Sequence, residues 1–503
     1  MNLKSLLYAL LAAGATCLNA ETPELKWDPG KFGRITELDG KQILTVEVSP
    51  EEVKDQINCA TAEISLIPYQ RSVLTFRISA RAENVTIPKH RYNGIKFMLN
   101  YVDNTGKEHW HNISGAAGSF DWKELSFTTQ LIQPAVRGKI LLGLQDSSGK
   151  VEFDLASLKI TRLFTASAEE YKAVYTDRVR KTPRLRGVMS PAKKFTEDDW
   201  KTLKDWNVNL VRAQICRNFG KTGTDRDLAE YDRWLNSVLD HYEKMFKLGH
   251  EKYGLRFVID LHTPPGGMLK NSDMAMFHEK IYADHFIKVW KRIAARFRGN
   301  PAVWAYDLIN EPIQLKPAPY DYWNLQKAAA EAIRKIDPDT PIMIASNHGD
   351  VPHSFSYLSP LKMKDVIYQV HMYDPGQYTH QGLGKFSGLA GKLSYPSVIE
   401  SIRYDREELR KFLKPVREFQ QKHNARIYVG EFSAAAWAPG ADRYLADCIA
   451  LFEEYGWDWS YHAFREAKVW SLEHEGESWS TLRPSADNPR KQVLLNGFRK
   501  NRK

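Results

Sequence analysis

The residues of this chain with the clearest chemical potential are two glutamates, each at the end of an apolar segment. Glu311 follows the segment 303–309, and Glu431 follows the segment 427–430. Apolar runs of this length are typical of buried strands in a parallel sheet. A carboxylate is costly to bury there, and the carboxyl ends of barrel strands are where catalytic groups lie. Two glutamates on different strands could therefore supply the carboxyl pair that cleaves a glycosidic bond.

The elements that would position these glutamates lie in residues 184–503. Apolar segments alternate there with amphipathic helical patterns, which indicates successive βα units. The expected strands are 185–189, 208–214, 256–261, 303–309, 342–346, 366–371, 427–431 and 457–461. The expected helices are 197–206, 228–248, 274–298, 322–336, 404–423 and 441–455. Eight such units predict an α/β fold that closes into a (β/α)8 TIM barrel.

Polar and aromatic residues follow several of these strands at the same end. Because the carboxyl ends of parallel strands meet at one rim of a barrel, we expect these residues to lie close together. The candidate site residues are Arg212, His262, Asn310, Glu311, His371, Tyr373, Glu431, Trp459 and His462.

Five short segments carry most of these residues, namely 207–212, 259–262, 307–312, 368–373 and 430–432. Together they resemble glycoside hydrolase family 5, the cellulase family, over nearly two thirds of the chain. An Asn-Glu-Pro tripeptide alone is a weak signal. Here it stands on the fourth strand, with a glutamate on the seventh and with Arg, His and His-x-Tyr on others. The resemblance implies a retaining glycosidase that needs no metal or organic cofactor.

The resemblance also implies a role for each candidate. Glu311 would be the acid/base and Glu431 the nucleophile, with their carboxyl groups roughly 5–5.5 Å apart across the scissile bond. Arg212 would keep Glu431 ionised by charge pairing, and Tyr373 would donate a hydrogen bond to the same carboxylate. Asn310 would contact the 2-hydroxyl of the sugar. The residues that would bind other hydroxyl groups are His262 and His371.

One candidate departs from the family pattern. The family usually has a tryptophan after strand eight as a platform beneath the sugar, but His462 stands at that position here. Trp459 or the later Trp470 could replace this platform. The neighbouring Arg465 and Glu466 could read polar groups of the sugar, or they could pair with each other. The sugar, its linkage and endo versus exo action therefore stay open.

Several alternatives remain. Glu311 could be an ordinary loop carboxylate, and Glu431 a buried ion-pair partner. His262 and His371 could bind a metal, although such barrels usually place two histidines on one strand end, and none of the expected strands ends in His-x-His. The intact glutamate pair could belong to a transglycosylase. The alternative outside enzymes is a carbohydrate-binding protein that has lost activity.

Residues 21–164 show a different pattern. Short alternating segments between polar turns predict an all-β jelly roll or β-sandwich. The segments 118–125, 142–145 and 151–155 resemble the carbohydrate-binding modules found beside secreted glycosidases. Aromatic residues that could form a sugar-stacking platform, or could simply pack in the core, are Tyr92, Tyr101, Trp110 and Trp122. Residues 165–183 are charged and polar, and we expect them to be a linker.

The first 20 residues predict a secretory signal peptide. Lys4 precedes an apolar segment, 6–15, that is too short to span a bilayer. Cleavage after Ala20 would yield a secreted or periplasmic protein, while Cys17 leaves a lipid anchor as an alternative. No later segment reaches about 18 uninterrupted apolar residues, so we expect no stable membrane insertion.

Composition narrows the partners further. The 503 residues include 71 Lys and Arg against 61 Asp and Glu, a formal net charge of +10. No basic run with interleaved aromatic residues favours nucleic acid. The expected partner is a polysaccharide or oligosaccharide substrate, and an acidic polysaccharide stays open. With only Cys59, Cys216 and Cys448 after cleavage, we expect at most one disulfide. The oligomeric state stays open.

Overall fold

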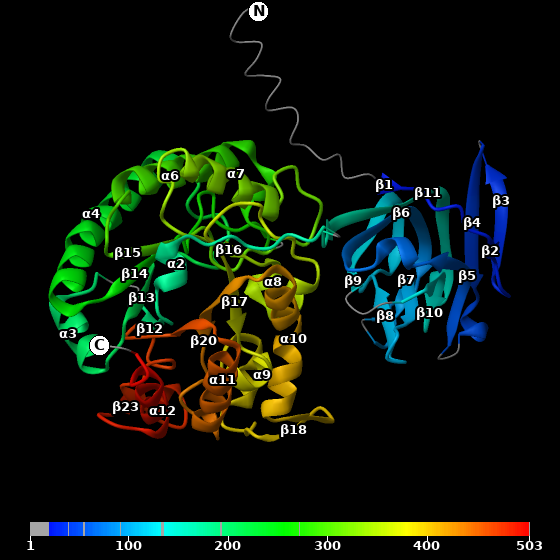
Figure 1. Cartoon of the computed structure of the whole chain (residues 1–503). Coiled ribbons are helices and arrows are strands. Elements are labelled where there is room, and N and C mark those ends of the chain that lie inside the picture. Colours follow the sequence, from blue (N-terminus) through cyan, green and yellow to red (C-terminus); the bar gives the residue numbers. More distant parts are fainter. Residues whose placement is uncertain are drawn as a thin grey trace, which may run out of the picture. The chain divides into compact units, whose positions relative to one another are not determined.

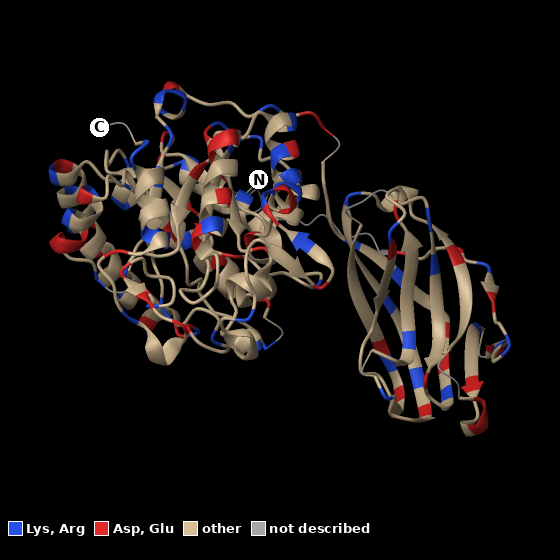
Figure 2. Ribbon diagram, turned by 90° about the horizontal axis from the view of Figure 1, so that it is seen from below, with Lys and Arg blue, Asp and Glu red and all other residues tan. Residues whose placement is uncertain are grey.

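The computed structural model describes residues 20–501 except 39, 54–55, 91, 132–134, 168, 192–193 and 271. The predicted signal peptide therefore lies outside the described residues, apart from its last position. The chain divides into two compact units, of which the first comprises the chain up to Ser167 together with the short segments 315–317 and 357–359 (Figure 1). Basic and acidic residues are interspersed along the elements of both units (Figure 2). The excess of basic residues is therefore not gathered in one element.

The first unit consists of two antiparallel sheets, which confirms the predicted all-β fold. One sheet contains, in order, β3 (Gly33–Leu38), β4 (Lys41–Val48), β11 (Gly149–Thr165), β6 (Ser72–Val85) and β9 (Gly118–Leu131), with β1 (Ala20–Glu21) paired to β11. The other contains, in order, β2 (Trp27–Asp28), β5 (Ile57–Ser65), β10 (Arg137–Gln145), β7 (Gly94–Val102) and β8 (Glu108–Asn112). Short 3-10 turns lie at Pro50–Glu52 and Ile67–Tyr69.

The side chains between these sheets form one hydrophobic core. Phe76 and Phe127 stack with ring centroids 4.9 Å apart, and Phe97 meets Phe127 edge-on at the same distance. Strand β5 shows how the sequence produces this core: buried and less buried residues alternate along it, so that every second side chain points between the sheets. Tyr101 is 4% exposed and belongs to this core, so its ring is not available for a sugar platform. The other platform candidates are exposed, and their binding of sugar stays a prediction: Tyr92, Trp110 and Trp122.

The second unit contains a closed barrel of eight parallel strands, as the sequence predicts. In order around the barrel they are β12 (Arg186–Met189), β13 (Leu210–Gln214), β14 (Arg256–Asp260), β15 (Val303–Asp307), β16 (Ile342–Ala345), β17 (Val366–Met372), β20 (Arg426–Phe432) and β21 (Asp458–Tyr461). Each of them overlaps a predicted segment. The barrel closes where β21 pairs with β12, with Tyr461 opposite Val188. All eight carboxyl ends therefore point to one rim.

Helices cover the outside of this barrel (Figure 1). The longer ones are α3 (Glu197–Asp205), α4 (Leu228–Tyr253), α6 (Lys280–Phe297), α7 (Tyr322–Arg334), α10 (Arg406–His423), α11 (Ala441–Tyr455) and α12 (Pro489–Phe498). Short helices are α2 (Asp177–Lys181), α5 (Ala275–His278), α8 (Asn347–Asp350) and α9 (Gly376–Thr379). Further 3-10 turns lie at Pro352–Ser356, Gly384–Leu389 and Trp479–Thr481, and small hairpins join β18 (Ser397–Ile399) to β19 (Ile402–Tyr404) and β22 (His474–Glu475) to β23 (Arg483–Pro484).

The longest helix shows how the sequence specifies this layer. The Asp227 side chain accepts hydrogen bonds from the backbone N–H groups of residues 229 and 230, which caps the start of α4, and Gly254 ends the helix in a left-handed conformation. The buried residues of α4 recur every three or four positions, as one face of a helix requires: Tyr231, Leu235, Leu239, Tyr242 and Phe246.

Residues 169–183 belong to the barrel unit, so the predicted linker is wrong for this stretch. The Thr176 N–H and hydroxyl groups donate to the Asp365 carboxylate at 2.7 and 2.8 Å. Val179, on α2, is 1% exposed and packs in one cluster with Leu185 and Leu210 from the start of the barrel. Polar composition alone did not reveal these anchoring contacts.

Two further expectations concern the described residues as a whole. Within them, no helix combines the length and the apolar character needed to cross a membrane. The cysteines at positions 59, 216 and 448 are free thiols.

Candidate active site

Glu431 lies on β20 with its carboxylate almost completely buried. Its Oε1 accepts a hydrogen bond from Nη1 of Arg212 at 2.7 Å, and its Oε2 accepts one from the Tyr373 hydroxyl at 2.8 Å. Burial alone would raise the pKa of Glu431, but the neighbouring histidines and Arg212 outweigh burial and hold the pKa well below its usual range. The carboxylate is therefore ionised at neutral pH, as a nucleophile requires.

A one-residue bulge in β20 places Glu431 at this point. The pairing of β17 with β20 skips one position, so that His371 pairs with Glu431 and Gly430 is the extra residue. A Cβ at position 430 would lie 2.6 Å from Oε1 of Gln369 and 2.8 Å from Nε2 of His371. Only glycine allows the backbone to pass so close to these side chains. The glycine before Glu431 is therefore part of the architecture of the site.

Arg212, on β13, is completely buried and faces three carboxylates at once. Besides its bond to Glu431, its Nε donates to Oδ2 of Asp307 at 2.9 Å, and its Nη2 lies 3.2 Å from Oδ1 of Asp260. Nη2 also donates to Oδ1 of Asn310 at 2.9 Å. Burial lowers the pKa of Arg212, but the three carboxylates outweigh burial and raise the pKa well above its usual value. The guanidinium thus holds residues from three other strand ends, those of β14, β15 and β20, around one permanent charge.

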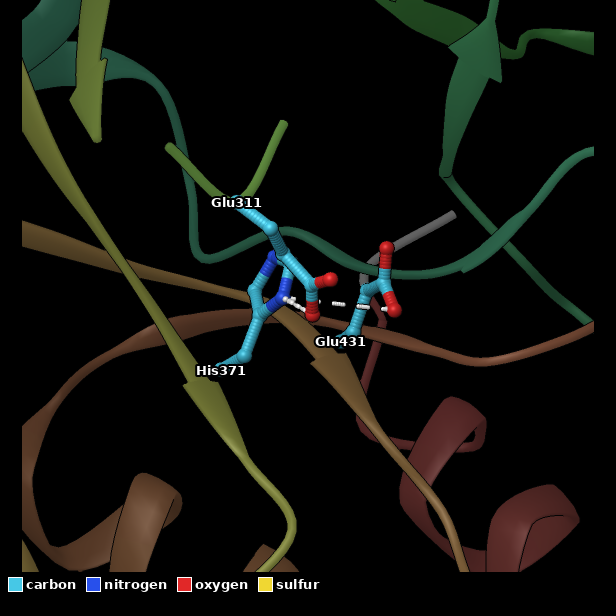
Figure 3. Close-up of side chains that lie close together, drawn as sticks. All are labelled: Glu311, His371 and Glu431. Carbon is cyan, nitrogen blue, oxygen red and sulfur yellow. Dashed lines mark hydrogen bonds and ion pairs between the residues drawn. The ribbon is translucent and has the colours of Figure 1, made fainter. Parts of the chain in front are cut away.

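Glu311 follows β15 at the same rim and is the more exposed glutamate. Its side chain is 25% exposed, against 6% for the side chain of Glu431. Glu311 adopts a φ of 45°, which is uncommon for a residue other than glycine, and its N–H donates to Oδ2 of Asp350 at 3.1 Å. One carboxyl oxygen of Glu311 and one of Glu431 lie within 4.8 Å of each other (Figure 3).

His371, on β17, lies close to both glutamates (Figure 3). Its Nδ1 is 3.0 Å from Oε1 of Glu311 and 4.0 Å from Oε2 of Glu431, and its Nε2 is 3.9 Å from Oδ2 of Asp350. Burial lowers the pKa of His371, but these carboxylates outweigh burial and raise the pKa to about 9. The ring is therefore an imidazolium at neutral pH and donates from Nδ1 to Glu311.

Tyr373 connects Glu431 to a second histidine. The Tyr373 hydroxyl oxygen lies 2.6 Å from Nδ1 of His462, and Nε2 of that ring lies 3.1 Å from Oε2 of Glu466. The same Glu466 oxygen accepts a hydrogen bond from Nε2 of Gln214 at 3.1 Å. Glu431, Tyr373, His462 and Glu466 thus form a continuous chain of polar contacts.

His262 and Asn310 form a buried pair beside Arg212. Nδ1 of His262 lies 2.8 Å from Oδ2 of Asp260, and its Nε2 lies 3.1 Å from Nδ2 of Asn310. Because a carboxylate only accepts, Nδ1 carries the proton and Nε2 accepts from the amide. Asn310 is 1% exposed, and its amide oxygen and nitrogen are both engaged. The predicted sugar contacts of His262 and Asn310 stay predictions.

Trp459 does not line the site, so its prediction as a sugar-binding residue is wrong. The side chain is completely buried, and its indole N–H donates to Oε1 of Glu453 on α11 at 3.1 Å. Its ring packs against Phe432 and against Phe498 of α12, with centroids 5.6 and 5.4 Å apart. Successive residues of a strand point to opposite faces, and this one points to the covering helices.

Trp470 lies beside the site instead. Its ring centroid is 5.6 Å from that of His462 and 6.4 Å from that of Tyr373, and it is 8% exposed. Arg465, considered as a reader of sugar groups, binds Glu473 through Nε at 2.7 Å rather than its sequence neighbour. Of the two tryptophans considered for the platform, only Trp470 is next to the candidate catalytic residues.

Sequence reasoning missed three buried carboxyl groups that hold the site, namely Asp260, Asp307 and Asp350. Burial raises the pKa of Asp307 to about 8, and it raises the pKa of Asp350 to about 7. Asp307 could have been found, because it stands in the same strand-end segment as Asn310 and Glu311. Asp350 gives no such signal, since it is the last residue of the short helix α8 and lies outside every predicted strand.

Within the described residues, the one cluster with the spacing of metal ligands consists of Glu311, His371 and Glu431. Nδ1 of His371 already contacts Glu311, and both oxygens of Glu431 accept hydrogen bonds from Arg212 and Tyr373. These donor atoms are thus engaged with protein groups. The same spacing also suits the carboxyl pair of a glycosidase, and the lack of a cofactor stays a prediction.

The sequence and the fold were compared with known protein families, curated proteins and solved structures. The family model described as Cellulase (glycosyl hydrolase family 5) matches residues 176–468, more than half of the chain. Endoglucanase C of Acetivibrio thermocellus is 26% identical over 296 residues, which cover 53% of this chain and 84% of the relative. Cellodextrinase A of Ruminococcus flavefaciens is 29% identical over 191 residues, 37% of this chain and 53% of the relative. A structure of Thermotoga maritima Cel5A in complex with cellobiose shares the fold, with a TM-score of 0.50 and 20% identity over 64% of this chain and 100% of that chain.

Proposed function

Because the chain belongs to glycosyl hydrolase family 5, the cellulase family, and is a glycosidase, we propose that it is a secreted retaining enzyme that hydrolyses a β-linked polysaccharide. The observation that carries the proposal is the separation of at most 4.8 Å between carboxyl oxygens of Glu311 and Glu431. Retaining glycosidases hold their two carboxyl groups roughly 5–5.5 Å apart, whereas inverting enzymes leave about 6.5–9.5 Å for a water molecule.

In the first step, an Oε atom of Glu431 attacks the anomeric carbon and the glycosidic C–O bond breaks. Glu311 gives its proton to the leaving oxygen, so the leaving sugar departs as an alcohol. The environments of the two groups support these roles. Glu431 is held ionised by Arg212 and Tyr373, while Glu311 is the more exposed group and can exchange its proton with solvent.

In the second step, water attacks the anomeric carbon of the glycosyl ester. Glu311, now ionised, takes a proton from that water, and the bond to Glu431 breaks. Both enzyme groups return to their starting protonation states. The anomeric configuration is retained because the carbon undergoes two inversions.

The substrate class follows from the relatives by analogy alone. Endoglucanase C and Cellodextrinase A have names that point to β-glucan and to short glucan chains respectively. We favour endo action on a β-glucan. The exposed aromatic residues of the first unit would help to hold the polymer, as in a carbohydrate-binding module.

Secretion is also part of the proposal, with cleavage after Ala20. Glu21 would then be the first residue. Its carboxylate lies 2.7 Å from Nη1 of Arg162 and accepts a hydrogen bond from the Tyr69 hydroxyl at 2.9 Å. These contacts would hold the new N-terminus against the sheet. Mass spectrometry of the protein recovered from the medium or periplasm tests this point.

The first experiment measures reducing-sugar release from β-glucans, mannan, xylan and acidic polysaccharides. Glu431→Ala should abolish the activity, and Glu407→Gln, on the exposed face of α10, should not change it. Adding azide should restore turnover of an activated aryl glycoside by the Glu431→Ala protein and give an α-glycosyl azide. The same treatment of Glu311→Ala should give the β-azide. Activity that survives in Glu431→Ala, or azides of the opposite configuration, would overturn the mechanism.

A further inference from the structure

The polar chain behind Glu431 contains one hydroxyl proton and two atoms that compete for it. The Tyr373 oxygen lies 2.8 Å from Oε2 of Glu431 and 2.6 Å from Nδ1 of His462. Both distances are those of hydrogen bonds. A tyrosine hydroxyl donates only one proton, so it cannot donate to both neighbours. The protonation of His462 therefore decides where the Tyr373 proton points.

The contact between His462 and Glu466 determines which placement of the protons satisfies every hydrogen bond. Oε2 of Glu466 lies 3.1 Å from Nε2 of the ring, and an ionised carboxylate can only accept. Nε2 therefore carries a proton. Because Glu431 also only accepts, the Tyr373 proton goes to Glu431, and Nδ1 must donate to the Tyr373 oxygen. All three bonds form together only when His462 is an imidazolium.

A neutral His462 would change this arrangement. With its proton on Nε2, the ring would present Nδ1 as an acceptor 2.6 Å from the Tyr373 oxygen. The hydroxyl would then be shared between Nδ1 and the carboxylate of Glu431. Glu431 would lose part of one of its two fixed hydrogen bonds, leaving mainly that from Arg212.

We infer that His462 and Glu466 are positioning residues for catalysis: Glu466 keeps a proton on His462, and the imidazolium directs the Tyr373 hydroxyl onto Glu431. This inference rests on the proposed role of Glu431 as nucleophile. It also accounts for the histidine at a position where the family usually has a tryptophan. The indole of a tryptophan has one N–H group and no second nitrogen that could take up a proton. It therefore could not become charged beside Glu466 and direct the Tyr373 hydroxyl proton.

The surroundings of His462 favour the charged ring. Burial lowers the pKa of His462, but Glu466 and Glu431 outweigh burial and raise the pKa above its usual value. Burial likewise raises the pKa of Glu466, but His462 outweighs burial and lowers it. The charged or titratable groups that face His462 come from several elements: Glu311 after β15, Tyr373 and His380 after β17, Glu431 on β20, and Glu466 on its own segment.

The direct test titrates the imidazole itself. In protein labelled with 15N-histidine, the signal of His462 is the one that is missing from His462→Gln. We expect it to titrate above an ordinary histidine, and Glu466→Gln should lower its midpoint by about one to two pH units. A matched control is Glu475→Gln, which removes a carboxylate of the same excursion that binds Arg483, and should leave the midpoint unchanged. This measurement does not require activity.

The functional test follows kcat/KM against pH with 2,4-dinitrophenyl β-cellobioside. Its leaving group needs no proton, so the general acid does not limit the first step. We expect kcat/KM to fall at alkaline pH as His462 loses its proton. In Glu466→Gln this fall, the alkaline limb of the profile, should occur at lower pH, displaced by about as much as the titration midpoint of His462. At acidic pH, where His462 is charged in both proteins, their kcat/KM values should nearly coincide. In the Tyr373→Phe background, Glu466→Gln should no longer move the limb.

Two results would overturn the inference. One is a His462 signal that is neutral at the pH of maximal activity. The other is an alkaline limb that Glu466→Gln leaves in place, or that it still moves after Tyr373→Phe. Failure of the proposed function looks different: hydrolysis would then persist in Glu431→Ala. A Glu431-dependent hydrolysis with an unmoved limb would refute only the role of Glu466 and His462.

Discussion

Replacing Trp459 with alanine is expected to destabilise the barrel while leaving catalysis intact. The side chain is completely buried between Phe432 and Phe498. Deleting a buried tryptophan side chain costs about 3–5 kcal/mol of unfolding free energy. The lost hydrogen bond to Glu453 adds about 1 kcal/mol, a small amount because two arginines still bind that carboxylate. The total is about 5 kcal/mol.

The assay combines thermal unfolding with steady-state kinetics at a temperature where both proteins are folded. For a domain of this size, each kcal/mol lowers Tm by about 2 °C, so the variant should melt about 10 °C lower. Its kcat and KM should match the parent. Trp470→Ala is the matched comparison, because it removes the same type of side chain from beside His462. That variant should raise KM about tenfold, or about 1.4 kcal/mol.

The two tryptophans thus give opposite expected results. If Trp459→Ala raised KM while Tm stayed unchanged, the ring would have to contact the sugar. The assignment of Trp459 to the layer between barrel and helices would then be refuted. If Trp470→Ala left KM unchanged, Trp470 would not be the platform.

Three further variants test the charges of the site. Arg212→Lys should lose at least about a hundredfold in kcat/KM and about 3–5 kcal/mol of stability, because one ammonium group cannot bind three buried carboxylates at once. Full activity of this variant would contradict the role of Arg212 in holding these carboxylates. Tyr373→Phe should lower kcat about tenfold to a hundredfold with KM little changed, since a bond to an ionised group is removed; a change confined to KM would contradict this. The pKa of His371 is raised to about 9, so its contribution to stability is complete below about pH 6.5 and disappears as pH rises through 9. The free energy of unfolding of His371→Asn, measured by denaturant titration, should therefore fall less between about pH 6.5 and 9 than that of the parent protein, by up to about 3 kcal/mol. An equal fall in both proteins would contradict the raised pKa.

The barrel and its rim could be predicted from sequence because each depends on local patterns. A strand buried on both faces is expected to be largely apolar, and most of the eight strands follow this pattern, although Asp458 and Ser460 interrupt it in β21. A polar residue at the end of such a strand then stands out. Arg212, His371 and Glu431 were found in this way, and the structure brings them together with Glu311.

The remaining features depend on side-chain direction and on contacts between distant segments. Trp459 and His462 are three residues apart, so a strand directs them to opposite faces, and this alternation could have excluded Trp459. The bulge at Gly430 interrupts such alternation in β20 and has no distinct local signal. Residues 169–183 and Asp350 owe their positions to tertiary hydrogen bonds, which composition does not reveal.

The site contains more acidic than basic groups, and this imbalance has a consequence for its pH dependence. The acidic groups are Asp260, Asp307, Glu311, Asp350, Glu431 and Glu466, and the basic groups are Arg212, His371 and His462. Because unpaired buried charge is costly, some carboxyl groups must hold protons. Burial raises the pKa of Asp350 to about 7 and that of Asp307 to about 8, so these two groups take up protons at a higher pH than ordinary carboxyl groups do. These ionisations are coupled, so a limb in the pH profile belongs to the whole set rather than to Glu311 alone. A variant that removes one member, as Glu466→Gln does, measures how much that member contributes to the position of a limb.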